Sequence, residues 1–272
     1  MPASPNDTAQ AAREEERDFE RLHSFSHAGT RINQHRALHR LPWTRRTAFR
    51  FVLPLGFTLL LLAGLEPLLH SWWVLFSWWQ PRLGLGSELR FLERDWLGLL
   101  YYYIPTPITP ADQPSDRVLG IALAATISLM AASHLLLRRR WLPVVYVLWA
   151  LGMFQLMAVG FFVWLPSLFP YTVAEHVGMG LDMGLTLVFL LPWLLALIYY
   201  PFGFGLARQI GTTALMVGWL VLFLPHQYLV HAAVLHWGTA LWMPLLFIVF
   251  GVFLNVVLLI AIYSWAMSAP RR

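Results

Sequence analysis

The sequence predicts an all-α protein, a polytopic membrane helix bundle with about six transmembrane helices. Two observations carry this prediction. Hydrophobic residues make up 58% of the 272-residue chain and charged residues only 12%, whereas a soluble domain usually carries about 25% charge. Apolar segments of the roughly 20 residues needed to cross a bilayer then recur along the chain. These features exclude a soluble enzyme, a disordered tail and a disulfide-stapled secreted module.

Two missing residue types narrow the chemistry further. The chain has no cysteine, which excludes thiol redox chemistry, cysteine-ligated zinc and iron–sulfur clusters. It also has no lysine, which excludes Schiff-base chemistry. The net charge of +5 therefore comes from arginine alone. Its distribution fits membrane orientation, so we expect no nucleic-acid partner.

The chain divides into a polar segment and a membrane domain. Residues 1–46 are rich in acids, arginines and histidines, and no apolar stretch occurs in the first 30 residues. We therefore expect a cytoplasmic N-terminal segment, not a cleaved signal peptide. Residues 47–270 form the expected six-helix transmembrane domain. Its spans are predicted near Phe49–Leu69, Val118–Leu137, Trp141–Leu165, Val177–Tyr200, Ala207–Val234 and Thr239–Met267.

The arginines predict the orientation. With a cytoplasmic N-terminus, fifteen of the nineteen arginines lie on the inner side. The four on the outer side are Arg82, Arg90, Arg94 and Arg117. Because cytoplasmic loops carry an excess of basic residues, we expect both termini to be cytoplasmic.

An outer interfacial loop, residues 70–117, connects the first two spans. Its HSWWVLFSWW stretch (70–79) places four tryptophans at the expected membrane boundary, where indole rings are favoured. Glu88–Tyr103 has charges at its start and aromatic residues at its end, and predicts an interfacial amphipathic helix. The proline-rich Ile104–Pro110 predicts an extended connector. We expect the loop to lie on the outer face as a lid or docking surface.

Ionisable residues gather at the outer ends of three spans. Glu175 and Asp182 are the only acids after residue 117, and their spacing of seven places both on one helix face. Glu66 and His70, four residues apart, also share a face. The fifth span adds three histidines, namely His226, His231 and His236. This asymmetry between the two ends of the bundle is the main functional signal in the sequence.

The spacing of the three histidines limits what they can bind. Steps of five residues point them about 140° apart around a continuous helix, so they converge on one ion only if the helix breaks, for which Pro225 is a candidate. A metal site that combines one or two of them with Glu175, His176 or Asp182 is easier to build. Imidazole and carboxylate without thiolate suit copper, zinc or iron. A b-type haem between two histidines stays open, as does simple hydration in the head-group region.

The order of elements over about residues 45–265 resembles the C subunit of the copper-dependent particulate methane and ammonia monooxygenases. GSELRFLERDWLGL (86–99) is similar to an acidic, Trp-Gly-containing stretch before that family's second span. TVAEHV (172–177) is similar to the family's Thr-Pro-Ser-His-Val, FLPH (223–226) to its Leu-Pro-Asn, and LHWG (235–238) to its Leu-His-Trp-Gly. The family's Asp-x-x-x-His has no counterpart between Phe162 and Tyr171.

The resemblance implies a monooxygenase-like, metal-dependent oxidoreductase subunit with a periplasmic-side copper site. His176, Asp182 and His236 are the first expected ligands, Glu175 is a ligand or orienting group, and the weaker candidates are His226, His231, Glu66 and His70. Another transition metal is an alternative to copper. We expect the lipid bilayer and other membrane subunits of a hetero-oligomeric complex as partners, in the inner (cytoplasmic) membrane of a bacterium. The alternatives are a non-metal permease or assembly subunit of a transport complex, or an accessory structural subunit.

Overall fold

The computed structural model describes residues 45–96, 98, 100–137, 141–199 and 205–268. Five helical segments are long and apolar enough to cross a membrane: α4 (Asp116–Leu137), α5 (Leu142–Trp164), α6 (Val173–Tyr199), α7 (Leu206–Trp237) and the run Ala240–Ala266. Each lies within a few residues of a predicted span, which confirms a mostly helical chain with several potential membrane spans. The predicted segment 1–46 lies outside the described residues except for its last two.

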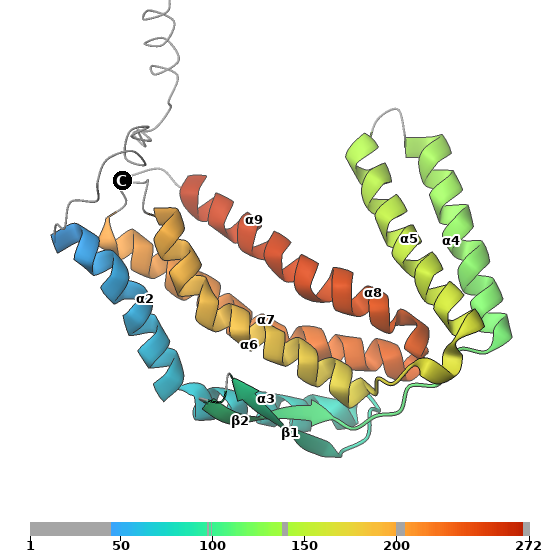
Figure 1. The fold of residues 1–272 in the computed structure, drawn as a ribbon, viewed down its shortest axis with the longest axis horizontal. Helices are drawn as coiled ribbons and strands as arrows, with labels where there is room; N and C mark the ends of the chain where they lie inside the picture. The colour runs from blue at the N-terminus through green and yellow to red at the C-terminus, as the bar shows by residue number, and fades with distance from the viewer. Residues whose placement is uncertain (1–44, 97, 99, 138–140, 200–204, 269–272) are drawn as a thin grey trace, which may run out of the picture.

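The last of these segments is built from four pieces. A 3₁₀ turn (Ala240–Trp242) leads into α8 (Met243–Phe247), a π-helix (Ile248–Phe253) and α9 (Leu254–Ser268). The end of α9 lies at the same end of the bundle as the start of α2 (Arg45–Ala63), as Figure 1 shows. The π-helix lies where the C-terminal run faces α7, and its backbone carbonyls accept hydrogen bonds from Gln227 of α7.

The first predicted span is bent. α2 ends at Ala63, and α3 (Leu65–Arg82) continues at an angle of 56° to it. Glycine at 64 is a weak helix former, and Pro67 has no N–H to donate to the Ala63 carbonyl, so the helix changes direction here. The two helices are long and apolar enough to cross a membrane only when they are taken together as one bent span. The aromatic stretch 70–79 therefore belongs to a helix and not to the expected loop.

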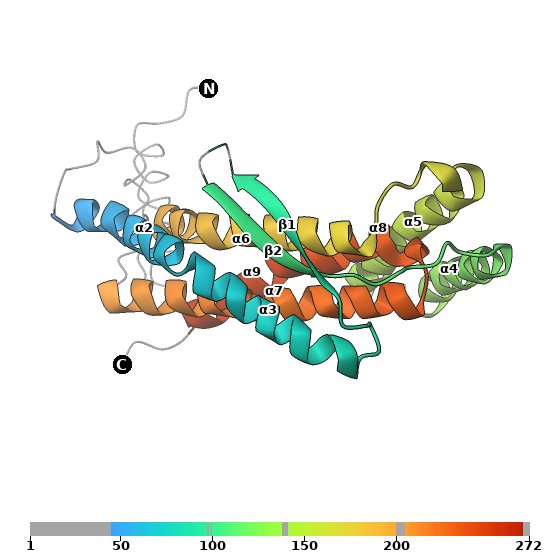
Figure 2. The same cartoon turned by 90° about the horizontal axis from the view of Figure 1, so that it is seen from below.

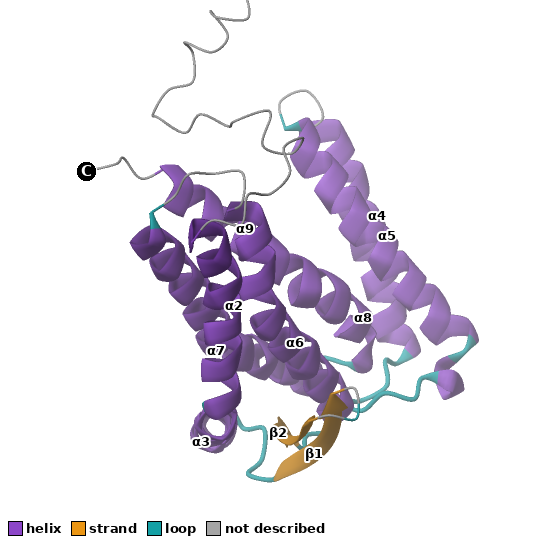
Figure 3. Cartoon of the chain, turned by 60° about the vertical axis from the view of Figure 1, so that its left-hand side comes forward, coloured by secondary structure: helices purple, strands orange, loops and turns teal. Residues whose placement is uncertain are grey.

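The predicted interfacial helix over Glu88–Tyr103 is wrong, because this segment forms a β-hairpin. β1 (Leu89–Trp96) pairs antiparallel with β2 (Leu100–Pro107), with Arg94 opposite Tyr102. Gly98 occupies the turn with φ of 70°, a conformation that favours glycine. Burial in β1 alternates with period two after Phe91, as expected for a strand with one covered face. Figure 3 shows the hairpin at one end of the bundle.

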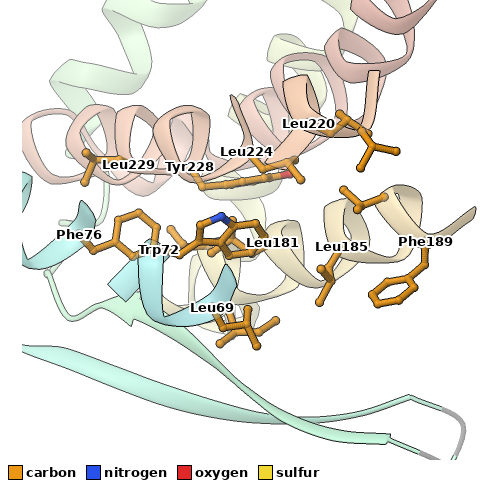
Figure 4. Packing of buried hydrophobic residues seen from close by; sticks show 14 of the residues in the cluster. Leu69, Trp72, Phe76, Leu181, Leu185, Phe189, Leu220, Leu224, Tyr228 and Leu229 are labelled. Atoms are coloured by element: carbon orange, nitrogen blue, oxygen red, sulfur yellow. The ribbon is translucent and has the colours of Figure 1, made fainter. Parts of the chain in front are cut away.

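The main core lies between α3, α6 and α7. Trp72 and Phe76 of α3 point toward α7, and Leu69, Leu181 and Leu224 belong to the same buried cluster (Figure 4). Gly180 and Gly184 lie on the α6 face that meets Tyr228 and Leu224 of α7. Small residues let two helix backbones approach closely. The register of α6 against α7 is therefore set by these two glycines.

Trp72 also completes the hydrogen bonding of α7. Pro225 has no N–H to donate to the carbonyl of Val221. The indole N–H of Trp72 donates to that carbonyl instead, at 3.0 Å. α7 is continuous from Leu206 to Trp237, so no break forms at Pro225 and the three histidines of the fifth span do not converge.

We expect Trp72→Phe to lower the free energy of unfolding by about 1–3 kcal/mol, because it keeps most of the buried ring but leaves the Val221 carbonyl without its donor. Thermal unfolding in detergent micelles measures the change. Trp265→Phe is the matched control, since Trp265 is 67% exposed. Equal melting temperatures for the two variants would contradict this role for Trp72.

The α4–α5 pair packs on the rest of the bundle only near one end. Its small core includes Leu119, Phe162 and Leu241, and α5 contacts α8 and the adjoining 3₁₀ turn. Away from that end the pair splays from the other helices (Figures 1 and 3). Only 11% of the apolar α4 segment is buried within the chain. Most of its apolar surface is thus available to lipid or to other helices.

Candidate functional site

Two predicted ligand residues meet in the core. His176 lies in the first turns of α6 and His231 near the end of α7, and both side chains are at most 2% exposed. His176 Nε2 lies 3.3 Å from His231 Nδ1. Because α6 and α7 run antiparallel, the start of one helix lies beside the end of the other, which brings together residues far apart in the sequence (Figure 2).

The π-helix supplies hydrogen-bond acceptors beside this pair. The side-chain amide of Gln227, one turn before His231 on α7, donates to the carbonyl of Phe250. Gln227 also donates to the Gly251 carbonyl at 3.3 Å. A π-helix displaces backbone carbonyls from the normal α-helical pattern and is frequent at functional sites. Here those carbonyls face a polar side chain of α7.

One nitrogen of each imidazole faces the other ring. Between two neutral imidazoles, one of these nitrogens can donate its N–H to the lone pair of the other, or both can present lone pairs to a metal ion.

Aromatic rings close the space around the two imidazoles. The Tyr228 ring lies 4.9 Å from that of His231 and 6.3 Å from that of His176, centroid to centroid. The Phe247 ring lies 5.7 Å from that of His176. Gly180 and Gly251 both lie against Tyr228, and hold it in place from two helices. The histidine pair is thus enclosed by apolar walls.

Asp182 does not reach the histidine pair. Its carboxylate accepts a hydrogen bond from the hydroxyl of Tyr102 on β2. Burial raises the pKa of the Tyr102 hydroxyl above its usual range, and the hydrogen bond to Asp182 raises it further. The bond joins the hairpin to α6, and Gly178 of α6 provides the close contact with Leu92 and Arg94 beside it. Asp182 is therefore a structural residue of the hairpin contact.

We expect Tyr102→Phe to weaken this contact by about 1.5–3 kcal/mol, the range for hydrogen bonds to charged groups. The raised pKa of Tyr102 means that the bond stabilises the fold fully below about pH 10 and loses its effect as the pH rises further. Thermal unfolding in detergent at neutral pH measures the difference. Tyr103→Phe, a change at the neighbouring exposed tyrosine, should have little effect, and equal losses from both variants would contradict the assignment.

The other predicted ligands have separate partners. Glu175 accepts hydrogen bonds from the Thr172 N–H and hydroxyl at 2.8 and 3.1 Å, which makes a reciprocal cap at the start of α6. His236 Nδ1 lies 2.8 Å from the Thr109 hydroxyl. His226 is exposed and bonds to the Leu222 carbonyl at 2.7 Å. None of the three is joined to the histidine pair by these bonds.

Glu66 and His70 line a different place, a cleft between α3 and the hairpin. The haem alternative is not tested by these contacts; the close approach of His176 to His231 only excludes a haem held between those two rings. Within the part of the chain that the structure describes, no group of three or more His, Cys, Asp or Glu residues could hold a metal ion. Of the eight candidate ligands, His176 and His231 are joined to each other by a side-chain contact.

Sequence reasoning missed Gln227, Tyr228 and the Phe250 carbonyl. Gln227 precedes His231 by four residues, so a search for polar residues one turn apart on an apolar helix finds it. The π-helix has no comparable signal, because Ile248–Phe253 is an ordinary apolar run.

No protein-family model matches the sequence, and neither a curated protein nor a solved structure matches the chain.

Proposed function

We propose that this chain is the metal-binding membrane subunit of a copper-dependent, monooxygenase-like oxidoreductase complex in the inner membrane of a bacterium. In this proposal His176 and His231 are the protein ligands. The observation that carries it is the buried pair of imidazole nitrogens 3.3 Å apart.

The distance between the two nitrogens supports shared coordination. Metal–nitrogen distances of about 2.0–2.1 Å at a tetrahedral angle place two ligand nitrogens about 3.3–3.4 Å apart. The same geometry also satisfies an N–H···N hydrogen bond between the two rings, which a metal ion would replace.

The predicted wider ligand set does not fit. Asp182, Glu175, His226 and His236 have the other partners described above, so further coordination positions would be left to water or a small substrate. A bound copper ion would supply redox chemistry toward oxygen. The residues of this chain would hold the ion and exclude bulk water with the Tyr228 and Phe247 rings.

Partner subunits are the second part of the proposal. The α4–α5 pair is apolar on nearly all sides and is packed only near one end. Helices of neighbouring subunits would cover part of this surface and lipid the rest. A second candidate function is an accessory structural subunit without a metal. The exposed apolar surface of α4 and α5 favours it, and so does the small number of candidate ligands.

Metal analysis of the protein isolated from its native membrane tests the proposal. We expect about one copper ion per chain, lost in the His176→Ala/His231→Ala double variant. Copper retained by the double variant would overturn the assignment. No metal in the wild type together with copurifying membrane subunits would favour the accessory role, and zinc in place of copper would support the site but exclude the redox function.

A further inference from the structure

The bend between α2 and α3 forms one wall of a cleft with a volume of about 820 Å³. The opposite wall is the hairpin, which runs beside α3 (Figure 2). The volume falls within the range of about 300–1,000 Å³ that is usual for ligand pockets. Glu66, His70 and Trp73 line the α3 side at positions one helical turn apart. Tyr101 and Tyr103 line the hairpin side.

The hairpin register places two carboxylates on the same strand face as the two tyrosines, although neither Glu93 nor Asp95 lines the cleft itself. Tyr101 lies opposite Asp95 and Tyr103 opposite Glu93, and residues directly opposite in an antiparallel pair share a face of the ribbon. All four are exposed. The basic residue Arg94 lies opposite Tyr102, on the face that packs against α6. Carboxylates and electron-rich rings therefore gather on the face away from α6.

This combination is suited to a cation. Tyrosine and tryptophan rings attract ammonium groups through their negative faces, and quaternary ammonium ligands are bound by such aromatic cages. A carboxylate beside the rings, such as that of Glu66, adds a full opposite charge. Anionic groups would be repelled by the same set.

The apolar part of the cleft points to an amphiphile. Leu62 and Leu65 line the cleft beside Glu66. Leu59 and Leu62 are exposed on α2, the helix that ends at the cleft. An apolar path thus leads from the cleft along α2. A lipid acyl chain can lie on this path while its head group stays among the rings.

We propose that the cleft binds the ammonium head group of a zwitterionic membrane lipid, with Glu66 as the counter-charge, Trp73, Tyr101 and Tyr103 as the aromatic cage, and the acyl chain along α2. The proposal is independent of the metal site, since no residue is shared between the two.

Native mass spectrometry of the protein released from detergent micelles tests this with added phosphatidylcholine and phosphatidylglycerol. We expect the wild type to prefer phosphatidylcholine. Glu66→Gln should lower the affinity for phosphatidylcholine about tenfold, the effect of removing one ionic or cation–π contact. Glu88→Gln is the matched control, because Glu88 is exposed near the hairpin but does not line the cleft. Tyr103→Leu, at an exposed position, replaces Glu66→Gln as the test variant if the latter fails to fold.

Competition with tetramethylammonium distinguishes a lipid site from a site for a small free cation. Phosphatidylcholine that stays bound in an excess of tetramethylammonium supports a lipid site. Displacement of the lipid by tetramethylammonium would assign the cleft to a small free cation and overturn the lipid assignment. Equal binding of the two lipids by the wild type, or equal affinities in Glu66→Gln and Glu88→Gln, would overturn the proposal as a whole.

Discussion

Gly180→Ala is expected to destabilise the protein by about 3 kcal/mol, at the upper end of the usual cost of overpacking. A methyl group at this position would overlap the ring of Tyr228. That ring is 1% exposed and is bounded on its other side by Gly251 of the π-helix, so it cannot move away cheaply. Alanine is the better helix former by about 1 kcal/mol, but the overlap is larger than this gain.

Thermal unfolding in detergent micelles measures the effect, with Gly218→Ala as the control. Gly218 lies in the middle of α7, and a methyl group there would meet nothing within 4 Å. This variant should be unchanged or slightly more stable. Gly184→Ala is expected to fall between the two, because it meets only the flexible end of Leu224. A Gly180→Ala variant as stable as Gly218→Ala would contradict the close packing of α6 on α7.

Loss of either buried histidine is expected to remove the metal almost completely. A site with two protein ligands loses half of them in a single substitution, so His176→Ala and His231→Ala should each release the metal, and the double variant should add little. Non-additivity of this kind marks two residues that act as one unit. Metal-to-protein ratios after dialysis measure the effect.

His226→Ala and His236→Ala are the matched controls, because both residues lie on α7 with His231. His226 is exposed and His236 bonds to Thr109, so both variants should keep the metal. Metal lost in His236→Ala and kept in His231→Ala would move the site to the end of α7 and contradict the pairing.

The membrane helices could be predicted from the sequence, whereas the elements between them could not. Runs of about 20 apolar residues predict the helix ends of α4 to α7 closely, because the bilayer fixes both length and composition. The segment 88–103 predicts a helix because it has charges at its start and aromatic residues at its end, but it forms a hairpin. Gly98 and the period-two alternation were the better indicators.

The candidate site shows a similar division. His176 and His231 are candidates from residue type alone, but their pairing depends on the register of α6 against α7. That register depends on how Tyr228 and Leu224 fit over Gly180 and Gly184, a packing match between helices that no local pattern reveals. Helix geometry alone predicts that three histidines five residues apart on an unbroken helix face different ways.

X-ray absorption spectroscopy of the metal-loaded protein reports the type, number and distance of the metal ligands together. If His176 and His231 hold the metal, the wild type has two imidazole nitrogens at about 2.0 Å, and His176→Ala/His231→Ala has no imidazole shell. A metal shell without imidazole in the wild type, or an imidazole shell that persists in the double variant, would contradict this assignment.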